Sequence, residues 1–182
     1  MSESLPSSIS LACVRKLLSL PDVVALVDTT KGAIGGGAPK IFQSRFPGVL
    51  AEDTSGLSVL VSQVAGKMLP FCSFKASLLE IEVWSDPERD THTATLVYDQ
   101  DEKALCLLSL IRESLTFTGS RSIAFVETWN SYQWWPSEEA DGRLRVLSCE
   151  VFREPEEVKL IGDQKQGDGL VRYRMLLEVT HD

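Results

Sequence analysis

Residues 77–84, SLLEIEVW, alternate apolar side chains with acidic ones. The apolar side is formed by Leu79, Ile81 and Val83, and the opposite side carries Glu80 and Glu82. A period of two residues is the pattern of a strand that buries one face. Residues 56–64, GLSVLVSQV, alternate in the same way. The two stretches predict strands of a sheet that has one face against an apolar core.

Residues 99–115, DQDEKALCLLSLIRESL, change to helical spacing. Asp99 and Glu102 resemble a capping box, and Gly119 lies just beyond the end, where helices often stop. A broad apolar stripe is formed by Ala104, Leu107, Leu108, Ile111 and Leu115. The spacing predicts an amphipathic helix that packs on the sheet.

The N-terminal region predicts a second helix over residues 8–20, with Ser7 or Ser8 as its N-cap and Pro21 as its stop. Its apolar positions are Leu11, Val14, Leu17 and Leu18. Residues 22–27, DVVALV, fit either a short strand or the tail of this helical region. Residues 1–7 are expected to be flexible.

Further strands are predicted at residues 40–46, 93–98, 122–128, 143–152 and 170–179. The stretch 93–98 is expected to form a hairpin with 77–84, and residues 153–169 a charged connection in a long terminal hairpin. Helices that alternate with runs of strands indicate an α+β fold. We expect residues 1–182 to form a single α+β domain, with two main helices on one face of a mostly antiparallel sheet.

The net charge of −8 argues against a protein that wraps nucleic acid by neutralising phosphates. No apolar run is long enough to span a bilayer, and the first residues lack the order of a signal peptide. We therefore expect synthesis in the cytoplasm and no membrane partner. The single cysteines Cys13, Cys72, Cys106 and Cys149 lie in apolar segments, which predicts buried free thiols.

The segment KGAIGGGAPKIF, residues 31–42, raises the question of a phosphate loop. In a P-loop the lysine is followed by Ser or Thr at the start of a helix, but Lys40 is followed by Ile41. Residues 30–39 are better interpreted as a mobile loop, because glycine is costly to order. Its candidate interface residues are Gly35, Gly36, Gly37 and Lys40.

A cluster of aromatic side chains follows residue 128 and comprises Trp129, Tyr132, Trp134 and Trp135. Large aromatic side chains are favoured anchors at protein interfaces, but they are equally favoured in cores. We expect one or two of them to be buried and the others to lie at a subunit contact.

Catalytic patterns are weak in this sequence. His92 and His181 are the two histidines, and neither sits in a recognisable motif. Glu157 and Lys159, with Asp141 upstream, could form a metal-dependent nuclease site, but a solvated loop explains them better. A surface turn likewise explains the carboxylates Asp86, Glu88 and Asp90 better than a calcium site does. We predict no catalytic residue, no metal site and no cofactor.

Two motifs suggest a family. EIEVWSD at residues 80–86 precedes the predicted helix, and DGRLRVL at residues 141–147 follows it. With the order of helix, loop, two strands, helix and strand, the chain resembles the tail terminator and head–tail joining proteins of long-tailed bacteriophages over roughly residues 8–152. The resemblance rests on this pattern and not on a catalytic signature.

The resemblance implies a structural virion protein that assembles in the host cytoplasm. Such subunits close into a ring, usually a hexamer, at the head-proximal end of the tail tube, where they end tube polymerisation and join the tail to the head. The implied partners are further copies of the chain, the tail tube protein and a head connector or stopper protein, while DNA passes through the lumen without specific binding. The extra stretch 93–98, the tryptophan-rich segment and the terminal hairpin leave open a stopper, an adaptor or another self-assembling scaffold protein.

The glycine loop leads to a first prediction. Replacing Gly35, Gly36 and Gly37 with alanine is expected to impair assembly more than folding, because the loop is expected to order only against a neighbour. Light scattering measures assembly and thermal unfolding measures folding. An equal loss of both would identify an ordinary structural turn.

Overall fold

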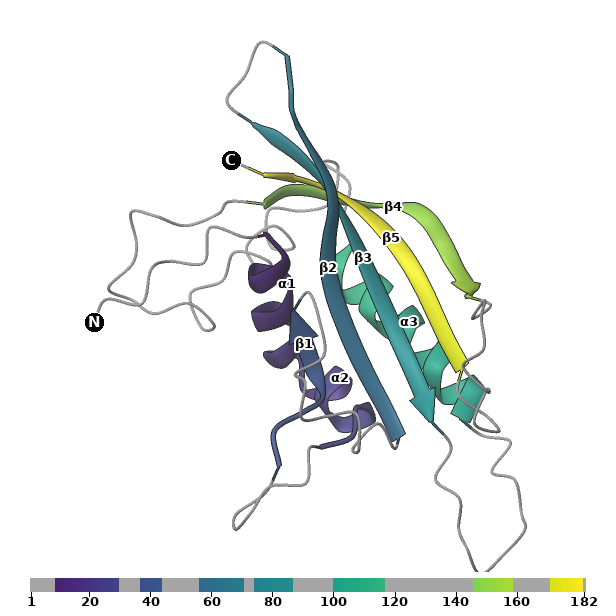
Figure 1. The fold of residues 1–182 in the computed structure, drawn as a ribbon. Helices are drawn as coiled ribbons and strands as arrows, with labels where there is room; N and C mark the ends of the chain where they lie inside the picture. The colour runs from purple at the N-terminus through teal and green to yellow at the C-terminus, as the bar shows by residue number, and fades with distance from the viewer. Residues whose placement is uncertain are drawn as a thin grey trace, which may run out of the picture.

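A five-stranded sheet forms the centre of the computed structural model, which describes residues 9–29, 37–43, 56–70, 74–86, 100–116, 146–158 and 171–181 (Figure 1). The strands are β1 (Ile41–Gln43), β2 (Gly56–Met68), β3 (Lys75–Asp86), β4 (Val146–Glu157) and β5 (Val171–His181). Their spatial order is β1-β2-β3-β5-β4, and every pair is antiparallel except β1 with β2. The helices α1 (Ile9–Leu18), α2 (Pro21–Leu26) and α3 (Gln100–Leu115) lie on one face of the sheet (Figure 1). The predicted α+β class is confirmed.

The core lies between this helical layer and the apolar face of the central strands. The alternation predicted for β3 is confirmed, since Leu79, Ile81 and Val83 have no exposed surface. The apolar stripe of α3 is also confirmed, because all five of its predicted members are fully buried. From β5 the core receives Met175 and Leu177, which lie opposite Ile81 and Leu79 in the register. The sheet and α3 therefore bury the side chains that their periodicities indicated.

The two N-terminal helices meet at Pro21. Helix α1 ends at Leu18, and the Ser19 hydroxyl donates a hydrogen bond to the Lys16 carbonyl at 2.7 Å. Pro21 then begins α2, which suits proline because the first residue of a helix needs no N–H partner. Residues 22–27 are thus mainly helical, which decides between the two predicted alternatives.

The predicted end of the strand at residues 143–152, which is β4 in the structure, is wrong. β4 continues past Phe152 to Glu157, so the first five residues of the expected connection 153–169 belong to a strand. Proline interrupts a ladder only where its missing N–H is needed, and β4 is an edge strand that accommodates Pro155 within the register shift between Arg153 and Glu156. Arg112 of α3 also contacts Glu154 at 3.0 Å. The antiparallel pairing of β4 with β5 confirms a long terminal hairpin.

Several predictions concern other parts of the chain. The predictions of strands at 93–98 and 122–128, of flexibility at residues 1–7 and of caps at Ser7, Ser8 and Asp99 concern residues outside the described ones. Within the described part of the chain, no helix is long and apolar enough to cross a membrane.

Core packing leads to a prediction with a built-in control. Leu107→Ala in α3 is expected to lower the free energy of unfolding by about 2–5 kcal/mol, because it leaves a cavity under the sheet. Leu105→Ala, two residues away and 45% exposed, should change it by less than about 0.5 kcal/mol. Urea denaturation of both variants measures the difference. Similar losses in both would contradict the assignment of the buried face.

Candidate interaction surface

The face of the sheet opposite the helices carries alternating charges from three strands. Glu80 and Glu82 point away from the core because they alternate with buried residues of β3. In the register, Glu82 lies opposite Arg174 of β5, and Trp84 lies opposite Arg172. The sequence showed the two glutamates, but the arginines that meet them were missed. The alternation of β5 could have located these arginines in the sequence, because Arg172 and Arg174 flank Tyr173, which is buried.

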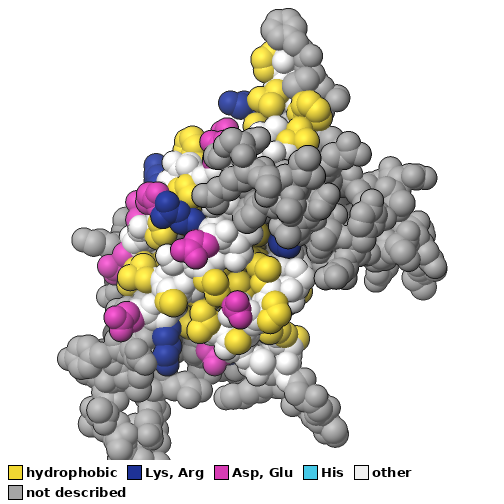
Figure 2. Space-filling model, turned by 180° about the vertical axis from the view of Figure 1, so that it is seen from behind, with side chains coloured by type: hydrophobic (Ala, Val, Ile, Leu, Met, Phe, Trp, Pro, Cys, Tyr) yellow, Lys and Arg dark blue, Asp and Glu magenta, His cyan; other side chains and the backbone are white. Residues whose placement is uncertain are grey.

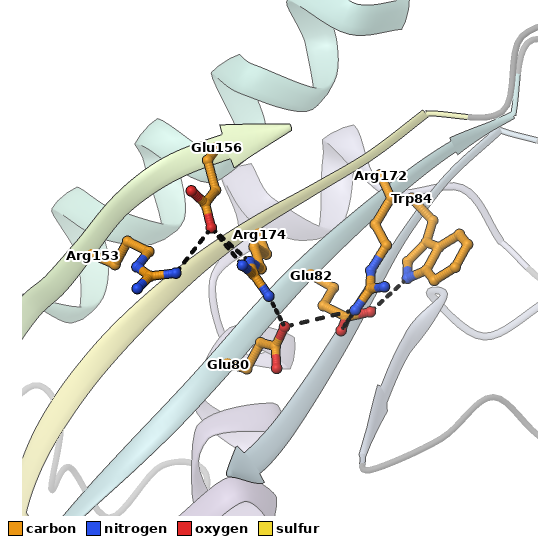
Figure 3. A network of polar contacts seen from close by, with 7 residues as sticks. All are labelled: Glu80, Glu82, Trp84, Arg153, Glu156, Arg172 and Arg174. Atoms are coloured by element: carbon orange, nitrogen blue, oxygen red, sulfur yellow. Dashed lines mark hydrogen bonds and ion pairs between the residues drawn. The ribbon is translucent and has the colours of Figure 1, made fainter. Parts of the chain in front are cut away.

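The inner half of this charged network is centred on Arg172 (Figure 3). Its guanidinium bonds the Glu82 carboxylate, lies 3.6 Å from Glu80, and sits 5.2 Å from the centre of the Trp84 ring. The Trp84 indole N–H donates to the second Glu82 oxygen at 2.9 Å. Side-chain exposure is 7% for Glu82 and 22% for Arg172. Since each charge has an opposite partner, this half of the network can be withdrawn from water.

The outer half joins β5 to the edge strand. Arg174 donates to Glu156 at 2.7 Å and lies 3.8 Å from Glu80, and Arg153 donates to Glu156 at 3.3 Å (Figure 3). Arg153 is 50% exposed and Glu156 is 41% exposed, so water screens these pairs. The outer half therefore positions the bulged end of β4 and contributes little stability.

The two halves shift carboxyl pKa values in opposite directions. Burial, followed by the repulsion of Glu82, raises the pKa of Glu80, and the two arginines only partly offset these effects. The hydrogen bond from Arg174 lowers the pKa of Glu156. The same face thus holds one carboxyl group that resists ionisation and one that favours it.

A shallow pocket of about 250 Å³ lies at the hairpin end of this face. Its side chains include Ala65, Leu78, Phe152, Lys67 and Glu178. Leu78 lies opposite both Ala65 and Glu178 in the register and alternates with the buried Leu79, which places the pocket on the helix-free side. Phe152 is 59% exposed. A pocket with an apolar floor, one basic side chain and one acidic side chain has the chemistry to accept a side chain from another protein.

Apolar groups are also exposed on β2 where the β2–β3 hairpin leaves the helical layer (Figure 1). Val64 is 49% exposed and Met68 is 59% exposed. The register shifts between Gln63 and Ala65, so Val64 is the bulged residue. Figure 2, seen from the helix side, shows hydrophobic side chains gathered with a basic one on this projecting end. The hairpin is thus the second apolar feature of the surface.

One of the two histidines, His181, takes part in a buried contact. The His181 Nε2 lies 2.9 Å from the Ser77 hydroxyl, which also accepts a hydrogen bond from Gln63 at 3.1 Å. Ser77 is 2% exposed and His181 is 4% exposed. A nucleophile must reach its substrate, and this pair is enclosed. It joins the last residue of β5 to β3 as a structural contact.

The predicted site residues are only partly covered by the described chain. The base of the glycine loop is closed by a bridge between Thr29 and Pro39, and the Lys40 N–H donates to the Asp28 carbonyl at 2.8 Å. The Lys40 side chain is buried, so it is not on the surface of the isolated chain, and its interface role stays a prediction. Gly37 lies beside this base. The remaining candidates lie outside the described residues: Gly35, Gly36, Trp129, Tyr132, Trp134 and Trp135.

The alternative nuclease residues are likewise incomplete. Glu157 is an exposed residue of β4, and Asp141 and Lys159 lie outside the described residues. Among the residues that the structure describes, no cluster of three His, Cys, Asp or Glu side chains is arranged to hold a metal ion.

The cysteine prediction holds for two of the three described cysteines. Cys13 and Cys149 are buried and free, and burial raises the pKa of Cys13 to about 12, so its thiol is unreactive. Cys106 is exposed, which corrects the prediction. It lies between the buried positions of α3 and points away from the sheet. Cys72 lies outside the described residues.

No family model matches the sequence, and no curated protein matches it either. The surface is therefore interpreted from its own chemistry. It combines a charged network of fixed geometry with an apolar pocket and an apolar hairpin at one end. In protein contacts generally, polar groups set the register and exposed apolar groups supply the burial.

The opposite pKa shifts give a paired prediction. A raised pKa in the folded state means that Glu80 stabilises the fold below its unfolded pKa and loses this contribution as the pH rises through the folded value. Glu80→Gln should therefore gain stability relative to wild type on going from acid to neutral pH. Glu156, with a lowered pKa, has the opposite sign, so Glu156→Gln should lose relative stability over the same range.

Denaturation midpoints of the two variants and the wild type, measured from about pH 4 to neutrality, test this pair. The two difference curves should have slopes of opposite sign. Difference curves with slopes of the same sign would show that the network does not shift the two pKa values in opposite directions.

Proposed function

We propose that this chain is the subunit of a ring at the head-proximal end of a bacteriophage tail tube, where it terminates the tail and joins it to the head. The order of elements supports the proposal. Helix α1, strands β2 and β3, helix α3 and strand β4 occur in the order of the resemblance, with α2 and β1 between α1 and β2. Both motifs contribute strand residues, because EIEVWSD ends β3 and the last two residues of DGRLRVL begin β4.

The observation that carries the proposal is the uncovered end of the sheet. Val64, Met68 and Phe152 are three large apolar side chains that are each about half exposed or more. Val64 and Met68 belong to β2 and Phe152 to β4, and exposed apolar groups of this kind mark interaction surfaces. A subunit of a ring covers such groups with its neighbours, whereas an isolated domain leaves them in water.

The charge of the chain supports a ring around DNA. Six copies with a net charge of −8 each would carry about 48 negative charges. A lumen of that sign repels phosphates, so DNA passes without being held. Sequence-independent passage needs no catalytic group and no base-reading side chain.

The proposal predicts a ring and an effect on tail length. The purified chain, alone or with the tail tube protein, should show the mass of a closed oligomer by light scattering and a ring with a central hole by negative-stain imaging. Adding it to polymerising tube protein should cap the tubes and stop their growth. Phe152→Asp should weaken both effects by at least about 10-fold, because it places a charge in an apolar contact.

The matched control is Leu105→Asp, which changes an exposed leucine of α3 far from this end of the sheet and should leave ring formation unchanged. A chain that stays monomeric at high concentration and with tube protein present would overturn the proposal. Magnesium-dependent DNA cleavage that Glu157→Gln abolishes would favour the nuclease alternative instead.

A further inference from the structure

Among the described strands, the sheet has two unpaired edges at its hairpin end. β1 pairs only with residues 59–61 of β2, so along residues 62–68 no described strand borders β2 on the side away from β3. On the other side of the sheet, β5 is the one described strand that pairs with β4. Free edges offer backbone and side-chain groups to a further chain.

The directions of the two edges match. β2 is antiparallel to β3, β3 to β5, and β5 to β4. β2 and β4 therefore run in opposite directions. If the β2 edge of one copy is laid beside the β4 edge of another, the two strands meet antiparallel, as do their neighbours within each sheet.

The hairpin edge is basic and apolar. Between Asp53 and Glu80 the sequence contains no carboxylate, but it contains Lys67 and Lys75, and both are exposed. Val64 and Met68 are the exposed apolar residues of the same edge. In a chain of net charge −8, this hairpin is a local positive feature.

The β4 edge is acidic and apolar. Glu150 lies directly opposite Glu178 of β5, both are exposed, and no described lysine or arginine forms an ion pair with either. Like charges across a strand pair are destabilising. Phe152 is the exposed apolar residue of this edge and lines the pocket with Glu178. The two edges are therefore complementary in charge, and each presents apolar side chains.

We propose that the β2–β3 hairpin of one copy docks on the β4 edge of the next copy, with its apolar side chains on Phe152 and its lysines facing Glu150 and Glu178. This inference rests on the proposed ring and names the two surfaces that close it. Because the hairpin and β4 belong to opposite edges of the sheet and differ in chemistry, the contact is heterologous and can be repeated from copy to copy until a ring closes.

The bulges on both edges define the kind of contact. β2 has a register shift at Val64, and β4 has three shifts along its length. Bulges interrupt a backbone ladder and twist the edge away from simple pairing. The contact is therefore made mainly by side chains, which restricts it to the complementary surface and disfavours endless sheet extension.

Two complementary variants test the contact. The hairpin variant carries Lys67→Glu and Met68→Asp, and the edge variant carries Glu150→Lys and Phe152→Asp. Each variant alone should be monomeric, because every contact in its ring would have one damaged surface. An equimolar mixture should form a dimer and nothing larger, because the intact edge of one variant receives the intact hairpin of the other. Light scattering measures the mass.

A charge exchange gives a milder second test. Lys67→Glu alone and Glu150→Lys alone should each weaken self-association about 10-fold, and the two together in one chain should restore most of it. Circular dichroism and thermal unfolding confirm that every variant folds. Leu105→Asp again serves as the surface control.

The outcomes separate this inference from the proposed function. If the wild type forms rings but the mixed variants stay monomeric, the contact is wrong and the ring stands. If both variants still form rings but fail to cap tubes, the surface binds the tube protein and the contact between copies is overturned. If the wild type forms no ring under any of these conditions, both proposals fail together.

Discussion

The burial of one face of β3 is the constraint on which the rest of the structure depends. Leu79, Ile81 and Val83 have no exposed surface, and Ile81 and Val83 lie between apolar residues of β2 and β5. An apolar sheet face must be covered, and here all three described helices lie on that side. With the helices on one side, the opposite face and the edges remain available for other contacts.

The same strand also determines the chemistry of the opposite face. Because side chains alternate, burying Leu79, Ile81 and Val83 forces Glu80 and Glu82 onto the other side, near the middle of the sheet. Two carboxylates there need cations, and Arg172 and Arg174 supply them from β5. The charged network thus follows from the core, and it stiffens the surface beside which the pocket and hairpin lie.

The sequence predicted features that depend on local periodicity and missed those that depend on neighbours. The strand alternation and the stripe of α3 were correct, because a half-buried element has to repeat with its own geometry. The length of β4 was missed, because Pro155 ends most strands but is tolerated at an edge, and edge position is a property of the whole sheet. The ion pairs of Glu80 and Glu82 could be predicted only with the register between β3 and β5 known. The exposure of Cys106 could be predicted only with the rotation of α3 about its axis known. For the interaction surface, composition indicated aromatic anchors among Trp129, Tyr132, Trp134 and Trp135. The surface described above instead uses Val64, Met68 and Phe152, three of the exposed apolar residues in the described part of the chain.

A chain with complementary edges must avoid forming open sheets before its proper assembly. Two features of this protein act in that direction. The bulges at Val64 and along β4 break the backbone ladder, and the net charge of −8 makes copies repel one another at long range. In the proposed contact, Lys67 and Lys75 would meet Glu150 and Glu178 and reverse that repulsion. The attraction would be short-ranged, because salt screens it within about 8 Å at physiological ionic strength. Association through the proposed contact would therefore depend on correct orientation, which favours the proposed closed ring over an irregular aggregate.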